Sequence, residues 1–497
     1  MSASKQKKLR SNSDAVDKKV IAAQEKAAKD KKYRRNAVIF IVIFAILVAV
    51  AVFINSNFFA TSPAAVVVNG NKYNATELSF YYSTAYNQFV QQYGDYVMYL
   101  IDTSKPLSEQ ECSLTDGGTW ADYFTEQALV LMEEADVLYN RAVADGYTID
   151  EEISQLAESN LAYLSATAMS QGHSDIDSYL ALAYCKGMDS EAYIDVVSKY
   201  LLATKYSGDN FNSYEYTDEQ LDAYYTENAS KYDTYSFNIY IINTSNEAYS
   251  EYETAEEKLA AAEADARTLV MATTEEEFNA TAAYLSGKDT VETKTMSIGQ
   301  NIPATYSEWL LDESRVEGDV FSTSTESAVY VLRYISREDC NYNTVDVRHI
   351  LIEAATDEGT TSTADALGTA KAEIDAIYEE WQANPTEENF IALAKEYSDD
   401  TAEDGLYEQV FKYQMVEEFN DFCFAENRQP GDVEIVYGSN GQYEGYHLIY
   451  FVGENDLYSH IIADNMLRNE DYSEFIESVT ANCSSELKWA SRFAGLD

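Results

Sequence analysis

The chain contains the stretch YSEWLLDESRVEGDV at Tyr306–Val320, and FNDFCFAENRQPGDV at Phe419–Val433 aligns with it without gaps. The flanking segments repeat in the same order at a nearly constant offset, which indicates a duplicated domain. The further matching pairs are Phe237–Ile242 with Val347–Ile352, Thr274–Phe278 with Thr386–Phe390, and Val329–Leu332 with Tyr446–Ile449. Both copies have the pattern of a strand, a long helix, short helices and a final strand. We therefore predict two tandem α+β domains, at 231–341 and 342–456, each of a size typical of one domain.

An apolar run, AVIFIVIFAILVAVAVFI at Ala37–Ile54, lies near the N-terminus, well before these two domains. At about 1.5 Å per residue it nearly spans a hydrocarbon core of about 30 Å. Basic residues stand immediately before it, so the positive-inside rule places the N-terminus in the cytoplasm. We predict a basic cytoplasmic tail at 1–36, a transmembrane helix at 37–55 and an extracytoplasmic remainder. The alternative is a cleaved signal peptide, but Phe58-Phe59-Ala60 is a poor cleavage site.

Charge is distributed very unevenly along the 497 residues, whose formal net charge is −51. Residues 1–36 hold twelve Lys/Arg and four Asp/Glu, whereas the remaining residues hold 22 basic and 81 acidic side chains. Such an acidic field argues against nucleic acid as a partner. The five cysteines include no CxxC pair and no histidine at ligand spacing, so we predict neither a disulfide framework nor a metal site.

The segment between the apolar run and the duplicated domains is expected to be mainly helical. Val66–Tyr73 is a β-branched run broken by Asn-Gly, which is a hairpin signal. Apolar residues three and four apart then predict amphipathic helices at Ala121–Ala144, Asp150–Met169 and Ser190–Tyr206. We assign 63–230 to one helical domain. Residues 457–497 contain a further amphipathic helix, expected to pack on that domain.

The second copy resembles the parvulin family of peptidyl-prolyl cis/trans isomerases over its whole length. Family motifs are matched in order by the opening strand, by an "F-x-x-L-A-x-x-x-S-x-D" segment, by "M-V-x-x-F" and by the closing "G-Y-H" strand. The corresponding residues are Val347–Ile352, Phe390–Asp400, Met415–Phe419 and Gly445–Ile449. Two of only four histidines fall on the two histidine positions of the family.

The resemblance implies a site without cofactor or metal. Met415, Phe419 and Leu406 would form the floor for the proline ring, and His349 and His447 would hydrogen-bond to each other. Asp400 would stand beside the reacting carbonyl, where family members carry Cys or Asp. Such chemistry fits the task, because isomerisation of an amide with a barrier of about 18–20 kcal/mol requires a dry, rigid pocket rather than a nucleophile.

Three features of the sequence bear on activity, and the first is a departure from the family pattern. The usual glycine-rich turn reads Asp404-Gly405-Leu406-Tyr407-Glu408, with one glycine left. The loop Glu353–Ala364 has no Lys or Arg, so phosphate recognition is not expected. In the first copy, Ile239, Tyr330 and Ile302 occupy the two histidine positions and the methionine position, so we predict a fold without catalysis there.

Residues 63–230 also resemble the helical N-terminal domain of SurA/PrsA-type envelope foldases. Together the resemblances imply a membrane-anchored extracytoplasmic prolyl isomerase and foldase, acting on unfolded exported polypeptides that contain X-Pro bonds. Uncatalysed X-Pro isomerisation takes tens to hundreds of seconds, slow enough to limit folding. The alternatives are a holdase chaperone with two inactive parvulin domains and a surface protein that displays its 41 tyrosines.

Overall fold

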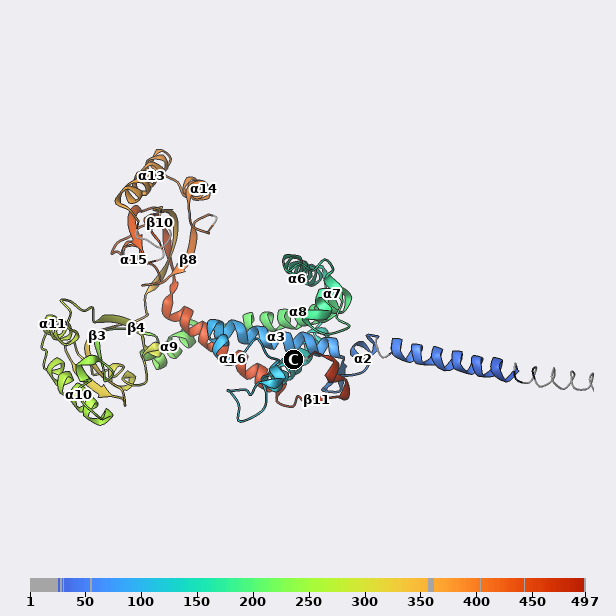
Figure 1. The fold of residues 1–497 in the computed structure, drawn as a ribbon. Coiled ribbons are helices and arrows are strands. Elements are labelled where there is room, and N and C mark those ends of the chain that lie inside the picture. The colour runs from blue at the N-terminus through green and yellow to red at the C-terminus, as the bar shows by residue number, and fades with distance from the viewer. Residues whose placement is uncertain are drawn as a thin grey trace, which may run out of the picture. The chain divides into compact units, whose positions relative to one another are not determined.

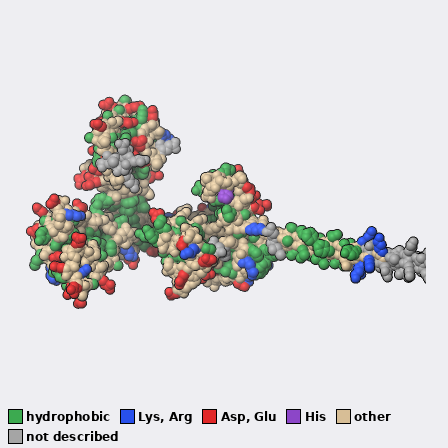
Figure 2. All heavy atoms as spheres, in the orientation of Figure 1, with side chains coloured by type: hydrophobic (Ala, Val, Ile, Leu, Met, Phe, Trp, Pro, Cys, Tyr) green, Lys and Arg blue, Asp and Glu red, His purple; other side chains and the backbone are tan. Residues whose placement is uncertain are grey.

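A computed structural model describes residues 26, 29, 31–53, 56–355, 362–402, 404–441 and 443–495. The chain divides into two compact units (Figure 1): Met1–Ser213 with Asp471–Asp497, and Tyr214–Glu470. Helices and sheets are both abundant, so the predicted α+β class is confirmed. Acidic side chains are scattered over the visible surface of both units, whereas a cluster of Lys and Arg lies at the start of the first helix (Figure 2).

The first unit begins with the helix Lys31–Phe53, whose mean hydropathy is 3.0 and whose side chains are exposed. It is the helix that, among the described residues, is long and apolar enough to cross a membrane. Residues 54–55 of the predicted transmembrane segment, and most of the predicted tail 1–36, lie outside the described residues. The short helix α2 (Phe58–Thr61) follows.

A small sheet and a group of helices form the rest of the first unit. Its strand order is β11-β1-β2, with β1 at Val66–Val68, β2 at Asn71–Tyr73 and β11 at Ser485–Leu487. Asn69 and Gly70 join β1 to β2 with φ of 50° and 92°, the left-handed pair that a tight hairpin requires. The helices are α3 (Ala75–Tyr93), α4 (Val97–Leu100), α5 (Trp120–Ala144), α6 (Glu151–Ser170), α7 (Ile176–Ala183) and α8 (Ser190–Asn212).

Aromatic side chains dominate the core of this unit. Trp120 and Phe124 of α5 are fully buried and pack against Phe89 of α3. Side-chain caps begin the helices where the sequence offers them: Asn74 caps α3 in a capping box with Glu77, and Asp150 caps α6. The sequence pattern therefore fixes where these helices start, and aromatic burial holds them together.

The second unit contains α9 (Asp218–Tyr232) and two four-stranded antiparallel sheets with the same topology. The first sheet has the order β4-β3-β6-β5 and the second β8-β7-β10-β9, so each copy places its first and last strands at the centre. The first copy comprises β3 (Thr234–Asn243), α10 (Ala255–Val270), α11 (Glu275–Ser286), β4 (Lys294–Ile298), α12 (Ser307–Leu310), β5 (Val320–Ser324) and β6 (Ala328–Glu338). The second comprises β7 (Asn343–Glu353), α13 (Ala364–Ala383), α14 (Glu387–Tyr397), β8 (Leu406–Val410), α15 (Glu417–Cys423), β9 (Val433–Ser439) and β10 (Glu444–Leu457).

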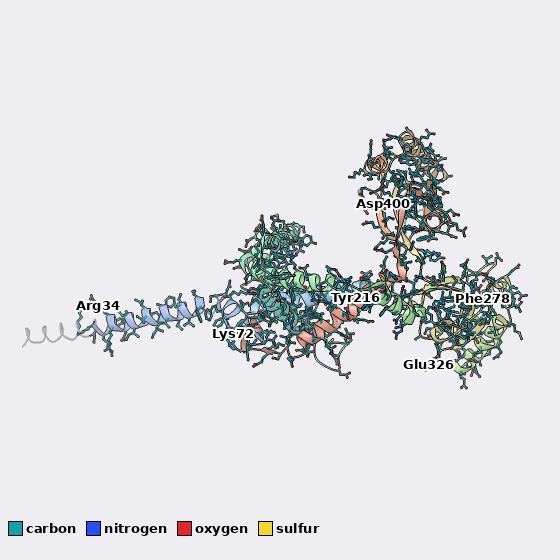
Figure 3. The ribbon with its side chains drawn as sticks, turned by 180° about the vertical axis from the view of Figure 1, so that it is seen from behind. Arg34, Lys72, Tyr216, Phe278, Glu326 and Asp400 are labelled. Atoms are coloured by element: carbon teal, nitrogen blue, oxygen red, sulfur yellow. The ribbon has the colours of Figure 1, made fainter. Side chains whose placement is uncertain are left out.

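Alternation along β7 gives the second copy two separate apolar layers. Ile350 and Ile352 face the core under α13 and α14, together with Phe390. Val345 and Val347 face the opposite side, where they share a core with Phe419 of α15. Because side chains alternate between the two faces along a strand, His349 and Leu351 also project to the α15 side. Figure 3 labels Asp400 in this copy and Phe278, the counterpart of Phe390, in the first.

The long helix α16 (Tyr458–Thr480) follows β10 and contains the boundary between the two units. Its last part and the C-terminal segment belong to the first unit, where β11 pairs with β1 in antiparallel register. The chain thus leaves the first unit after Ser213 and returns to it at Asp471.

Candidate active site

A cavity of about 470 Å³ opens on the α15 side of the second sheet. Its walls combine seven polar or titratable side chains with an apolar floor. The lining residues are His349, Leu351, Asp400, Tyr407, Gln414, Met415, Val416, Phe419, Asn440, Tyr443 and His447. Five of the six residues predicted for the site are therefore brought together.

The two histidines lie on the neighbouring central strands β7 and β10. His447 is opposite Leu351 and His349 is opposite Ile449, so both rings project from the same face of the sheet. Each side chain is only 4% exposed, and the two Nδ1 atoms are 3.2 Å apart. The rings are stacked with a centroid separation of 5.4 Å.

Burial lowers the pKa of His349 to about 4 and that of His447 to about 3, from an ordinary 6.5. The proximity of His349 lowers the pKa of His447 further, while the carboxylate of Asp400 opposes the shift for both. Both imidazoles are therefore neutral at pH 7, and each carries one N–H.

Neighbouring groups decide which nitrogen carries that proton. The Tyr443 hydroxyl lies 2.9 Å from His447 Nε2, and His349 Nε2 faces Asp400 Oδ2 at 3.6 Å. A lone pair on His349 Nε2 would be buried against a carboxylate, which is unfavourable. The favourable arrangement runs in one direction: Tyr443 donates to His447 Nε2, His447 Nδ1–H donates to His349 Nδ1, and His349 Nε2–H points at Asp400.

Asp400 is held in place from its other side. Its Oδ1 accepts a hydrogen bond from the Tyr407 hydroxyl at 2.9 Å and another from the backbone N–H of Ala402 at 2.9 Å. Burial and the bond to Asp400 raise the pKa of Tyr407 to about 12, so its hydroxyl keeps its proton. The carboxylate is therefore fixed at the rim of the cavity.

Phe419 and Met415 supply the apolar floor. Phe419 is 1% exposed and presents its ring edge-on to both imidazoles, with centroid separations of 5.5 Å. Met415 and Val416 pack against the same cluster. The histidine pair therefore packs directly against the Phe419 ring of this floor.

Two glycines make room for the histidine pair. Gly405 has φ of +68°, and a Cβ there would lie 2.4 Å from the His349 carbonyl oxygen. Its own carbonyl accepts the backbone N–H of His349 at 2.9 Å. On β9, a Cβ at Gly438 would lie 2.6 Å from His447 Nε2. The single glycine retained in the turn is thus one that the site needs.

The prediction for Leu406 is wrong, because this residue does not line the cavity. Leu406 is paired with Arg348 and Tyr407 with Val347, so Leu406 projects to the helix side of the sheet and Tyr407 to the cavity side. The predicted set contains neither Tyr407 nor Tyr443, although both side chains line the cavity. The period of two, counted from His349 across to β8, is the signal that would have found Tyr407. The loop Glu353–Ala364 is described only in part, since residues 356–361 lie outside the described residues.

The first copy fills the corresponding space with apolar side chains. Tyr330 is opposite Ile241 and Ile239 is opposite Leu332, the same register as the histidines of the second copy. Tyr306, at the position of Phe419, contacts Tyr330 with a centroid separation of 5.9 Å. Ile239, Ile302, Tyr306 and Tyr330 all belong to one hydrophobic cluster, which contains no histidine.

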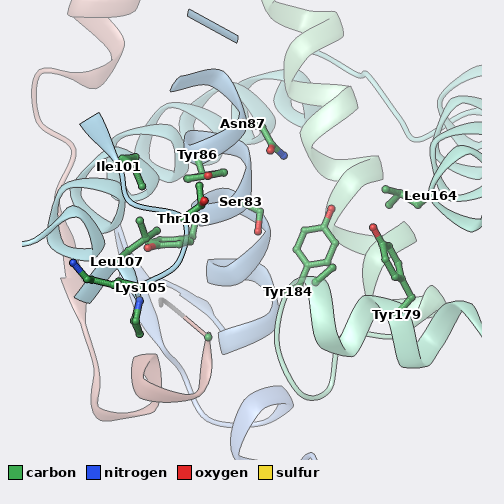
Figure 4. Close-up of a pocket in the computed structure, with 14 residues that line it drawn as sticks. Ser83, Tyr86, Asn87, Ile101, Thr103, Lys105, Leu107, Leu164, Tyr179 and Tyr184 are labelled. Carbon is green, nitrogen blue, oxygen red and sulfur yellow. The ribbon is translucent and has the colours of Figure 1, made fainter. Parts of the chain in front are cut away.

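A second cavity of about 470 Å³ lies in the first unit (Figure 4). Tyr86, Ile101 and Leu107 stand on one side of it, and Leu164, Tyr179 and Tyr184 on the other. Its walls are mainly aromatic and aliphatic, with hydroxyl groups at the edges.

Comparison with known proteins gives one family match. Residues 329–453 match the family described as the PPIC-type PPIase domain. No curated protein matches the chain.

Several solved structures are similar at low identity. PrsA from Bacillus subtilis is 14% identical, with 76% of this chain and 93% of that chain covered and a TM-score of 0.27. The peptidylprolyl isomerase PrsA from Bacillus anthracis is 21% identical, with 28% of this chain and 58% of that chain covered and a TM-score of 0.17. The foldase protein PrsA from Lactococcus lactis is 11% identical, with 69% and 96% covered and a TM-score of 0.19. These likenesses carry no conclusion about function, whereas the family match coincides with the domain that holds the histidine pair.

Proposed function

We propose that this chain, which carries a parvulin-type domain of the PPIC family, is a membrane-anchored prolyl isomerase and foldase for exported polypeptides. The observation that supports it best is the cavity of the second copy, where a neutral, hydrogen-bonded histidine pair stands behind an apolar floor and a fixed carboxylate. The activity needs no metal or cofactor, because the reaction only rotates a bond.

The cavity suits this reaction for a physical reason. Twisting the X-Pro amide destroys its resonance, so the carbonyl oxygen loses partial negative charge as the barrier is approached. A fixed carboxylate at Asp400 would repel the planar amide more than the twisted one, and thereby favours the transition state. Phe419 and Met415 would hold the proline ring while the preceding residue rotates. The histidine pair would keep the Phe419 ring and Asp400 in position.

Membrane anchoring is proposed from the helix Lys31–Phe53 and the basic residues before it. With the N-terminus in the cytoplasm, both units would lie outside the membrane on the opposite side. Polypeptides emerging there are unfolded and contain X-Pro bonds in both isomers.

The test is an isomerisation assay with Ala-Pro peptides on the full chain and two variants. Phe419→Ala removes the floor, worth about 1.5–3 kcal/mol of burial, so we expect a loss of about 10- to 150-fold in kcat/KM. Asp400→Asn removes a charge but keeps the shape, and a loss of about 2- to 12-fold follows from about 0.5–1.5 kcal/mol. Tyr306→Ala, the matched change in the first copy, should leave the rate unchanged. An uncatalysed rate for the folded wild type would refute the proposed activity.

A holdase without isomerase activity is the second candidate, and the cavity of Figure 4 is the observation that favours it. Its aromatic walls would bind apolar segments of an unfolded chain without any chemistry. An aggregation-suppression assay separates the two functions. Tyr179→Ala with Tyr184→Ala should weaken suppression and leave Ala-Pro isomerisation intact, whereas Phe419→Ala should do the reverse.

A further inference from the structure

Five aromatic side chains from two ends of the chain meet directly after the apolar helix. Phe53 ends that helix, and its ring lies 5.0 Å from Phe58 and 5.3 Å from Phe59 between centroids. Phe59 is stacked on Phe493 at 5.5 Å and contacts Trp489 edge-on at 6.1 Å. The last two belong to the short helix η5 (Trp489–Phe493), so the C-terminal segment is joined to the helix end through rings. We call Phe53, Phe58, Phe59, Trp489 and Phe493 the aromatic collar.

Three aromatic side chains of the collar, Phe53, Phe58 and Trp489, are exposed to solvent. Trp489 is 53% exposed and Phe58 is 45% exposed, whereas Trp120 and Trp381 are buried. Trp309, the remaining tryptophan, is stacked on Phe321 with a centroid separation of 5.1 Å. An exposed tryptophan beside exposed phenylalanines is unfavourable in water unless something covers it.

The length of the apolar run indicates how deep the collar lies relative to the bilayer. Ala37–Ile54 is just long enough for a hydrocarbon core of about 30 Å, so Phe53 would stand at its outer boundary. The headgroup layer beyond that boundary is about 5–8 Å thick. Phe58 and Phe59 are in ring contact with Phe53, and Trp489 contacts Phe59, so the collar begins at that boundary.

Charge at the collar has the opposite sign to the rest of the ectodomain. The Arg492 guanidinium lies over the Trp489 ring at 5.8 Å, and its Nε donates to the Trp489 carbonyl at 2.8 Å. In the part of the chain that the structure describes, no carboxylate pairs with Arg492, which is exposed. Lys488 is nearby and pairs with Glu486. Tryptophan with arginine is the combination that headgroup layers favour.

We infer that the aromatic collar and Arg492 form a membrane-contact surface whose ligand is the phospholipid headgroup layer of the leaflet that the helix Lys31–Phe53 leaves. The inference rests on the proposed anchoring and goes beyond it, because an anchor alone would leave the first unit free to tumble on its tether. Ring contacts on Phe53 and insertion of Trp489 instead seat the first unit on the bilayer in one orientation. Arg492 lets an otherwise acidic ectodomain approach anionic headgroups.

The experiment uses the full chain reconstituted into phosphatidylcholine vesicles, with and without lipids brominated near the top of their acyl chains. Bromine quenches tryptophan fluorescence only at short range, so we expect quenching in the wild type. Trp489→Phe should lose most of that quenching, because the other three tryptophans lie in folded cores or stacks. Trp309→Phe is the matched control and should retain all of it. In vesicles that contain phosphatidylglycerol, Arg492→Glu should reduce the quenching, with little effect in phosphatidylcholine alone.

The outcomes separate this inference from the anchoring on which it rests. Failure of the wild type to float with vesicles would overturn both. Flotation with equal quenching in wild type and Trp489→Phe would overturn the membrane-contact surface alone. Protection of Trp489 from both brominated lipid and aqueous acrylamide would mean that protein covers the collar, and would overturn the assignment to lipid.

Discussion

Gly438→Ala is the smallest change that should disable the candidate site without touching a residue that contacts substrate. The backbone of β9 accepts alanine there, since Gly438 has no positive φ. The new Cβ, however, would lie 2.6 Å from His447 Nε2, 2.8 Å from His447 Cδ2 and 3.2 Å from Val416 Cγ2. These distances are well inside van der Waals contact, so the imidazole has to move.

The cost of that movement follows from what holds the ring. His447 is fixed at Nε2 by Tyr443, at Nδ1 by His349 and on its face by Phe419. Displacement breaks one or both hydrogen bonds, worth about 0.5–1.5 kcal/mol each, and overpacking of this kind usually costs about 1–3 kcal/mol. We expect the second copy to lose about 1–3 kcal/mol of unfolding free energy and kcat/KM to fall about tenfold or more.

Urea unfolding and the Ala-Pro assay on the same preparations measure both quantities. Gly453→Ala on β10 is the matched control, because nothing lies within 4 Å of its Cβ position, and it should change stability by less than about 0.5 kcal/mol. A fully active, fully stable Gly438→Ala would refute the claim that the histidine ring is held in a single position.

Three further predictions concern the same domain and its copy. The folded-state pKa values, about 4 for His349 and about 3 for His447, lie below the value of 6.5 in the unfolded chain, so the unfolded chain binds more protons between these values. The unfolding free energy should therefore fall as the pH drops from 6.5 toward 3. Thermal melts should show this fall, and its slope should be shallower in His447→Gln. Phosphorylated Ser-Pro peptides should react no faster than unphosphorylated ones at low salt, since the exposed Glu353 begins an acidic loop, and a several-fold advantage for phosphate would contradict this. Ile239→His with Tyr330→His should create no isomerase in a Phe419→Ala background and should lower the melting temperature, because buried polar groups without partners cost about 1–3 kcal/mol each.

The histidine pair is predicted from the resemblance to the parvulin family, and the geometry of the sheet explains why the two rings meet. In the observed register of β7 and β10, His447 is opposite Leu351 and His349 is opposite Ile449, so both side chains project from one face of the sheet. Leu406 and Tyr407 depend instead on how β8 is registered against β7, and that pairing shifts between Val345 and Val347. A one-residue uncertainty in register exchanges the two faces of the sheet, so the sequence alone does not distinguish Leu406 from Tyr407 as the residue that faces the cavity.

Long-range contacts account for the other differences. Helix α8 continues to Asn212, past the predicted end at Tyr206, although Gly208 weakens it. Phe211 packs on Tyr472 with a centroid separation of 5.6 Å, and this contact stabilises the last turns. The strand β11 has no recognisable sequence signal of its own, because three residues become a strand only through pairing with β1.

The return of the chain to the first unit has a consequence for biosynthesis. The backbone N–H of Ser484 bonds to the Asn69 side chain across 415 positions of sequence, and β11 pairs beside it. A polypeptide crossing a membrane from its N-terminus would therefore expose β1 long before its partner strand emerges. The inserted second unit contains all of its own strand partners and can mature first. A chain that lacked Ser485–Leu487 would therefore keep an unpaired edge on β1, which is a site for aggregation or proteolysis.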